Sequence, residues 1–85
     1  MTAKRAADVI WTYAPVERTD FLDHMTSKRA SEVIWNYGWT DRLATLDRMT
    51  SKRAALVIAQ YSSAAKADVL SRLSPARKIE IVKFL

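Results

Sequence analysis

The chain repeats itself at a fixed spacing of 24 residues. Residues 1–6 read MTAKRA, and the motif returns as MTSKRA at 25–30 and again at 49–54. A fourth copy begins at residue 73 and covers about half of the unit. Because no gap is needed to align the copies, each should fold in the same way and pack on its neighbour, as in a tandem-repeat array.

Each copy opens with the pattern of an amphipathic helix. In the second copy Ala30, Val33, Ile34 and Tyr37 are spaced i, i+3, i+4 and i+7, which places them in one stripe of a helix. A hydroxyl residue precedes the stripe in every copy and predicts an N-cap. These residues are Thr2, Thr26, Thr50 and Ser74. Gly38 predicts the end of the helix, since glycine can adopt the left-handed conformation there.

A second, shorter helix fills the rest of each copy. Its start is marked by Pro15, Thr40-Asp41 and Ser62-Ser63 in the three copies. The predicted helices cover residues 3–13, 16–24, 27–37, 41–48, 51–61, 64–72 and 75–85. We therefore predict an all-α fold, an α-solenoid of about three and a half helical hairpins with seven helices. We expect one domain over residues 1–85, with repeats 1–24, 25–48 and 49–72 and a half repeat 73–85.

Composition and charge limit the classes of protein that fit. The 85 residues include one glycine, two prolines and no cysteine, which excludes disulfides and thiolate metal sites and favours helices. No apolar run is long enough to span a membrane and no signal-peptide core follows the N-terminus, so we expect a cytoplasmic protein. A net charge of +5 permits contact with nucleic acid, anionic lipid or an acidic protein without choosing among them.

No pattern of residues predicts catalysis. His24 ends a short helix where the other copies have Arg48 and Arg72, so we expect it to interact with the helix dipole. Asp23 and Asp47 recur one repeat apart and are expected to pair with arginines. Without a Gly-rich phosphate loop, paired metal ligands or a nucleophile triad, we predict a non-enzyme with no cofactor, metal or small-molecule ligand.

Paired basic residues open the long helices and are the candidate contacts for a protein partner or for nucleic acid. They are Lys4, Arg5, Lys28, Arg29, Lys52 and Arg53. Packed copies would align them along one edge, where a regular row of positive charge can follow a phosphate backbone. Arg18, Arg42 and Lys66 would form a second row. The alternative is structural: lysines stand four residues before Asp8 and Glu32, and the arginines can reach a carboxylate of the preceding short helix.

Aromatic residues predict contacts between copies. Trp11 and Trp35 lie on a second flank of the long helix, where the third copy has Ala55 and Ala59. A helix that is apolar on two sides should touch two neighbours, so we expect Trp35 to cover the alanine surface of the following copy. Trp39 is expected to pack across its turn, and an exposed contact point is the alternative. The tyrosines of the stripe are expected in the core, and they are Tyr13, Tyr37 and Tyr61.

The last predicted helix is apolar around more of its circumference than one hairpin can cover. Ile79 and Phe84 lie away from the stripe, which continues through Val82 and Leu85. An uncovered end of a repeat array exposes apolar surface. We therefore expect these four residues to mediate self-association or to be covered within a longer array.

The opening MTSKRASEVI, followed by a short helix ending LDRM, resembles the short helical repeats of the cytoplasmic N-terminal domain of MgtE-type magnesium transporters. Related repeats occur in the N-terminal part of the flagellar motor-switch protein FliG, and residues 73–77, LSPAR, match their helix opening best. The resemblance implies a right-handed α-superhelix used for protein contact. The acidic residues by which the transporter domains sense magnesium have no counterpart here, so no site is carried over.

These features predict a helical-repeat interaction scaffold that binds a protein partner or associates with itself as a homo-oligomer. The first alternative is a nucleic-acid-binding repeat protein that uses the Lys-Arg pairs. The second is a duplicated or engineered repeat protein without a dedicated ligand, because about half of the positions are identical between adjacent copies and no gap separates them. A regulatory domain of a transporter or motor protein is the third.

Overall fold

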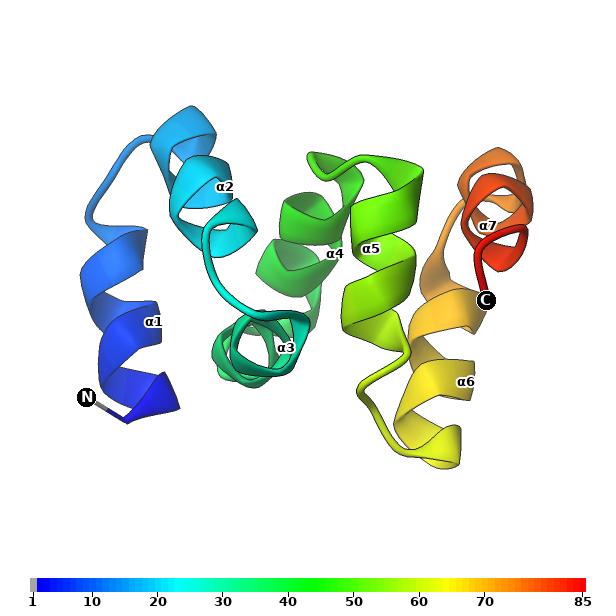
Figure 1. Cartoon of the computed structure of the whole chain (residues 1–85), viewed down its shortest axis with the longest axis horizontal. Coiled ribbons are helices and arrows are strands. Elements are labelled where there is room, and N and C mark those ends of the chain that lie inside the picture. Colours follow the sequence, from blue (N-terminus) through cyan, green and yellow to red (C-terminus); the bar gives the residue numbers. More distant parts are fainter. Residues whose placement is uncertain (1) are drawn as a thin grey trace.

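The computed structural model describes residues 2–85, which form seven α-helices and no β-strand (Figure 1). The helices are α1 (Ala3–Trp11), α2 (Pro15–Asp23), α3 (Ser27–Trp35), α4 (Trp39–Asp47), α5 (Ser51–Ile58), α6 (Ser63–Arg72) and α7 (Pro75–Val82). The predicted all-α fold is therefore confirmed. None of these helices combines the length and the apolar character that crossing a membrane requires.

A threonine or serine caps the N-terminus of each odd-numbered helix, as the sequence predicts. The hydroxyls of Thr2, Thr26 and Thr50 each accept a hydrogen bond of 3.2 Å from the backbone N–H three residues later. Ser74 accepts the equivalent bond at 3.4 Å. Each hydroxyl satisfies one of the backbone donors that the start of a helix leaves without a partner.

The odd-numbered helices end two or three residues earlier than predicted. At eight or nine residues they are no longer than the even-numbered helices, which have nine or ten, so the prediction of a shorter second helix is wrong. The prediction that Gly38 ends α3 is also wrong. Gly38 has an extended backbone, with φ −66° and ψ 166°, and is the N-cap residue of α4, which begins before Thr40. The chain leaves α3 through a tighter turn, in which the N–H groups of Asn36 and Tyr37 donate to carbonyls three residues earlier at 3.1 Å. No residue between 2 and 85 has a positive φ, so none of these helices ends in a left-handed cap.

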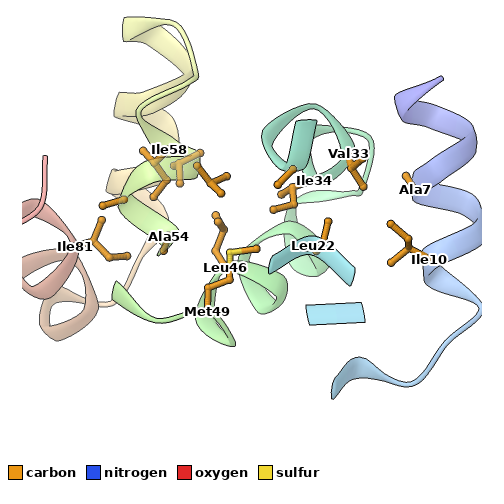
Figure 2. Packing of buried hydrophobic residues seen from close by; sticks show 14 of the residues in the cluster. Ala7, Ile10, Leu22, Val33, Ile34, Leu46, Met49, Ala54, Ile58 and Ile81 are labelled. Carbon is orange, nitrogen blue, oxygen red and sulfur yellow. The ribbon is translucent and has the colours of Figure 1, made fainter. Parts of the chain in front are cut away.

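The odd-numbered helices pack side by side, α1 on α3, α3 on α5 and α5 on α7. Their stripe residues are buried, as the spacing predicts: Ala30, Val33 and Ile34 have no exposed surface. Leu22 of α2 is fully buried beside them, and Ile81 of α7 extends the same core. Figure 2 shows the buried side chains as a continuous row that runs from α1 to α7.

Small residues occupy the contact between neighbouring odd-numbered helices. Ala7, Ser31 and Ala55 stand at the same position of the repeat, and all three are buried. The hydroxyl of Tyr37 donates to the Ala7 carbonyl at 3.1 Å, and that of Tyr61 donates to the Ser31 carbonyl at 2.8 Å. A small side chain at this position therefore leaves the backbone open to a residue of the following copy.

An arginine of α5, in the third copy, contacts residues of both the first and the second copy. The Arg53 guanidinium donates to the carbonyls of Leu22 (2.8 Å) and Met25 (2.5 Å) and to the Ser27 hydroxyl (3.0 Å). The Asp23 carboxylate lies 3.7 Å from its Nε. These acceptors form the turn between α2 and α3, so Arg53 satisfies carbonyls at the end of α2 and holds α5 against that turn.

Arg77 makes the same set of contacts one copy later. It donates to the carbonyls of Leu46 (3.1 Å) and Met49 and to the Ser51 hydroxyl (3.0 Å), and its Nε lies 3.9 Å from Asp47. The predicted pairing of the repeated aspartates with arginines is confirmed. The helix predicted to supply the aspartate is wrong, however. Arg53 of α5 pairs with α2 rather than with α4, and Arg77 of α7 pairs with α4 rather than with α6.

Replacing Arg53 by methionine should destabilise the fold by about 2–3 kcal/mol, because the Leu22 and Met25 carbonyls lose a charged donor. Lys52→Met is the matched control: Lys52 is the exposed neighbour, and its loss should cost less than about 0.5 kcal/mol. Chemical denaturation followed by circular dichroism measures both free energies of unfolding. Equal stability of the two variants would contradict the capping role of Arg53.

Candidate interaction surfaces

The predicted row of Lys-Arg pairs separates into exposed lysines and arginines with differing surroundings. The exposed lysines are Lys4, Lys28 and Lys52. Arg5 is also exposed, but Arg53 is turned into the molecule, with 19% of its side chain exposed. Glu32 pairs with Arg29 at 3.8 Å, where the spacing predicted a lysine partner. The expected ladder of paired charges is therefore wrong at Arg53, because the α2–α3 turn binds that guanidinium.

Arg18 and Arg42, two members of the expected second basic row, lie over tryptophans and bind carbonyls at the ends of α1 and α3. The Arg18 guanidinium is 3.8 Å from the ring centre of Trp11 and donates to the Trp11 carbonyl at 2.9 Å. Arg42 lies 3.8 Å from the ring centre of Trp35 and donates to the carbonyls of Trp35 and Tyr37 at 2.8 Å. Each arginine thus combines a cation–π contact with capping of helix carbonyls.

A tyrosine of the following copy stacks on each of these tryptophans. Tyr37 lies 4.8 Å from Trp11, and Tyr61 lies 4.9 Å from Trp35, between ring centres. We call these sets the Trp–Arg–Tyr clusters: Trp11 with Arg18 and Tyr37, and Trp35 with Arg42 and Tyr61. One copy later, the equivalent residues are Ala59, Lys66 and Leu85. All three residues change together there. This is expected if the arginine and the tyrosine are kept because they pack on the indole.

Trp35 meets the following copy through Tyr61. Ala55 is buried as part of the core, whereas Ala59 is exposed. The expected cover of Ala59 by Trp35 is therefore wrong, because the indole stacks against Tyr61. Trp39 lies edge-on to Trp35 at 5.7 Å between ring centres, in agreement with its predicted packing role.

Burial changes the pKa values of the tyrosines in these clusters. It raises the pKa of Tyr37 to about 12, because the phenolate loses solvation, and Arg18 opposes this rise. Burial also raises the pKa of Tyr61 well above its usual value, against the opposing charge of Arg42. Both hydroxyls therefore keep their protons at neutral pH and can donate to the carbonyls of the preceding copy.

Apolar side chains remain exposed at the α1 end of the molecule. Val9 and Tyr13 are each 40% exposed and Phe21 is 43% exposed, whereas Val33 and Val57, which are equivalent to Val9, are fully buried. The rings of Tyr13 and Phe21 lie 4.8 Å apart. We define the α1–α2 face as Val9, Tyr13 and Phe21, together with Glu17 and Asp20 beside Phe21. The prediction of Tyr13 in the core is wrong, because no helix within residues 2–85 covers this side.

A second apolar strip lies on α7, at the opposite end of the helix row (Figure 1). Ile79 is 63% exposed and Val82 is 47% exposed. We define the α7 face as Ile79 and Val82, together with Lys78 and Lys83 along the same side of the helix. Phe84 and Leu85 follow the helix and are also exposed. The four residues predicted to mediate self-association are therefore accessible.

Two features of residues 2–85 bear on small ligands. No group of three or more His, Cys, Asp or Glu side chains in this part of the chain is arranged to hold a metal ion. An open groove of about 540 Å³ lies between α3 and the α5–α6 turn, lined by Lys28, Glu32, Trp35 and Tyr61 among others. His24, which the sequence places at the end of a helix, is the C-cap residue of α2. Its Nδ1 lies 2.7 Å from the Asp20 carbonyl oxygen.

Sequence reasoning missed Arg77 and the α1–α2 face. Arginine occupies its repeat position in all four copies, whereas the lysine before it is replaced by Ala76 in the fourth. Because the arginine recurs in the fourth copy and its lysine neighbour does not, the pattern indicates a structural role for the arginine alone. No comparable signal marks Val9 or Tyr13, because their equivalents in the later copies are similar residues in contact with another helix.

No protein-family model, curated protein or solved structure matches this chain.

Trp35→Ala should destabilise the fold by about 2 kcal/mol, because the indole supports both Arg42 and Tyr61. Leu56→Ala is the control, since Leu56 is a large side chain in the exposed part of α5 and should cost less than about 0.5 kcal/mol. Guanidinium denaturation gives both values. A loss for Trp35→Ala no greater than that for Leu56→Ala would show that the indole does not join the copies.

Tyr37 should make stability fall as the pH rises from 10 towards 12. Its pKa is 10.0 in an unfolded chain and about 12 in the fold, so the unfolded state releases the proton first and alkali favours unfolding. This contribution is complete below pH 10 and is lost as pH rises through about 12. Urea denaturation across this range should show a shallower pH dependence for Tyr37→Phe than for wild type. Tyr13→Phe, on an exposed side chain, is the control, and equal slopes for the two variants would contradict the prediction.

Proposed function

We propose that this chain is a non-enzymatic helical-repeat scaffold that binds a protein partner. In this proposal the copies form an α-solenoid, which the return of the arginine contacts one copy later supports. The two Trp–Arg–Tyr clusters, also one copy apart, support the same arrangement. The resemblance to the MgtE-type and FliG repeats favours a right-handed superhelix with an interaction role.

The observation that carries the proposal is the apolar surface at both ends of the helix row. Val9 is exposed although its equivalents, such as Val33 and Val57, are fully buried. Ile79 is exposed although its equivalents in the other three copies are buried. Apolar patches that are rimmed by charged residues mark protein-binding surfaces. Aromatic residues such as Phe21 are also typical anchors of protein interfaces, because they bury a large apolar area.

Nucleic-acid binding is the second candidate, and the row of exposed lysines favours it. The arginines that would strengthen such a surface are engaged elsewhere: Arg18, Arg42 and Arg53 all donate to backbone carbonyls. The rings that would stack on bases are also occupied, since Trp11 and Trp35 each contact an arginine and a tyrosine. Protein binding therefore accounts for more of the exposed surface.

Titration with single-stranded and duplex nucleic acid of mixed sequence, followed by tryptophan fluorescence, separates the two candidates. At about 0.15 M salt we expect no saturable binding by the wild-type chain, and the same result for the variant in which Lys28 and Arg29 are reversed to glutamate. Saturable binding that weakens steeply with salt and disappears in this double variant would make the chain a nucleic-acid-binding protein.

Cross-linking of bound protein to the chain then distinguishes an interaction scaffold from a repeat protein that has no dedicated ligand. Phe21→Ser and Ile79→Ser each remove one exposed apolar anchor, and Lys52→Glu changes an exposed residue outside both faces. A bound protein that the Lys52 variant retains and one of the face variants loses would support the scaffold. If no protein is retained by the wild-type chain, the scaffold proposal is wrong.

A further inference from the structure

The two end faces carry charges of opposite sign. Glu17 and Asp20 adjoin Phe21 on the α1–α2 face, one helical turn apart. On the α7 face the charged residues beside the apolar strip are Lys78 and Lys83. Each face therefore combines exposed apolar side chains with neighbouring charges, which are acidic beside Phe21 and basic beside Ile79 and Val82. Surfaces with this pairing of features attract each other and fix their relative orientation.

The two faces cannot meet within one molecule, because they lie at opposite ends of the row of helices. Figure 1 places α1 and α7 at the two ends, along an axis on which the chain extends 31 Å. Within residues 2–85 neither face can reach the other, so a second molecule is needed to bring the two kinds of face together. A contact between two unlike faces leaves one face of each kind free, so it can grow into longer chains.

We propose that the α1–α2 face of one molecule docks on the α7 face of a second copy, so that the protein associates head to tail. The two apolar strips pack on each other, and the acidic rim of one face lies against the lysines of the other. The inference rests on the proposed scaffold function and identifies its partner as a second copy of the chain.

Residues at both faces depart from the repeat in ways that suit such a contact. Phe21 is larger than its equivalents Thr45 and Val69, both of which are buried. On α7, Lys78 and Ile79 replace the buried pair of alanines at positions 54 and 55. Because these side chains are larger and charged, the distance from the face to a docked helix would exceed the distance between neighbouring helices inside the molecule. The contact is therefore made by side chains and differs from the internal contacts between copies.

The size of the faces sets the expected strength. Each face consists of one or two helices of eight or nine residues, so the buried area should be below the roughly 800 Å² per partner of a standard interface. A dissociation constant above about 1 µM is expected for a contact of this size. Self-association should therefore depend on protein concentration, and its charged part should weaken with salt.

Sedimentation velocity over a range of concentrations tests the proposal with paired charge reversals. Wild type should form species larger than a dimer as concentration rises. Reversing Glu17 and Asp20 to lysine, or Lys78 and Lys83 to glutamate, should weaken association at least tenfold. The variant with all four reversals should recover it, because the two faces are complementary again. Reversing Lys28 and Lys52 to glutamate changes the net charge as much as the α7 variant does and should have little effect.

Four outcomes would overturn the head-to-tail contact. The first three are a wild-type chain that stays monomeric up to about 1 mM, association that neither paired reversal weakens, and association that the fourfold variant does not recover. Growth that stops at a dimer would indicate a contact between two like faces and would also contradict it. A monomeric wild type whose captured protein still depends on Phe21 or Ile79 would leave the scaffold proposal standing, with a different partner.

Discussion

Helices of eight to ten residues leave much of their backbone without partners inside the helix, and this constraint governs the whole molecule. A helix of that length is not stable alone in water. The threonine and serine caps satisfy donors at the start of the odd-numbered helices. Carbonyls at the helix ends are satisfied by arginines from elsewhere: Arg53 binds the end of α2, and Arg42 binds the end of α3. Because Arg53 and Arg77 come from later copies, completing one short helix and joining the copies are the same interaction.

The need for donors at the helix ends explains why arginines and lysines occupy different places in the fold, although they stand side by side as basic residues in the sequence. A guanidinium has several donors in one plane, so Arg53 can serve two carbonyls and a hydroxyl at once while keeping its charge near Asp23. An ammonium group cannot match that planar arrangement. The flat guanidinium also lies on an indole, and the position of Arg42 becomes Lys66 in the copy where the tryptophan has become Ala59. The lysines beside the arginines remain at the surface.

The sequence predicts the local features of this fold well, because they depend on residues a few positions apart. The seven helices, the hydroxyl caps and the buried stripe around Ile34 follow from spacing alone. Gly38 could not be assigned from its identity, since glycine is compatible with both the end of one helix and the extended start of the next. The partner of Arg53 could not be assigned either, because it depends on how α5 lies against the α2–α3 turn. Tyr13 follows the stripe but lacks the neighbour that its equivalents have.

In a chain built from copies, a residue that departs from the repeat needs an explanation of its own. Trp39 is such a departure, and packing explains it: the Arg72 guanidinium lies 4.1 Å from its ring centre and that of Arg42 lies 4.4 Å away. Phe21 and Ile79 also depart from the repeat, yet both leave apolar surface exposed. Packing within residues 2–85 therefore does not account for these two side chains. Contact with another molecule would account for them, and the opposite charges beside them support the proposal that this molecule is a second copy.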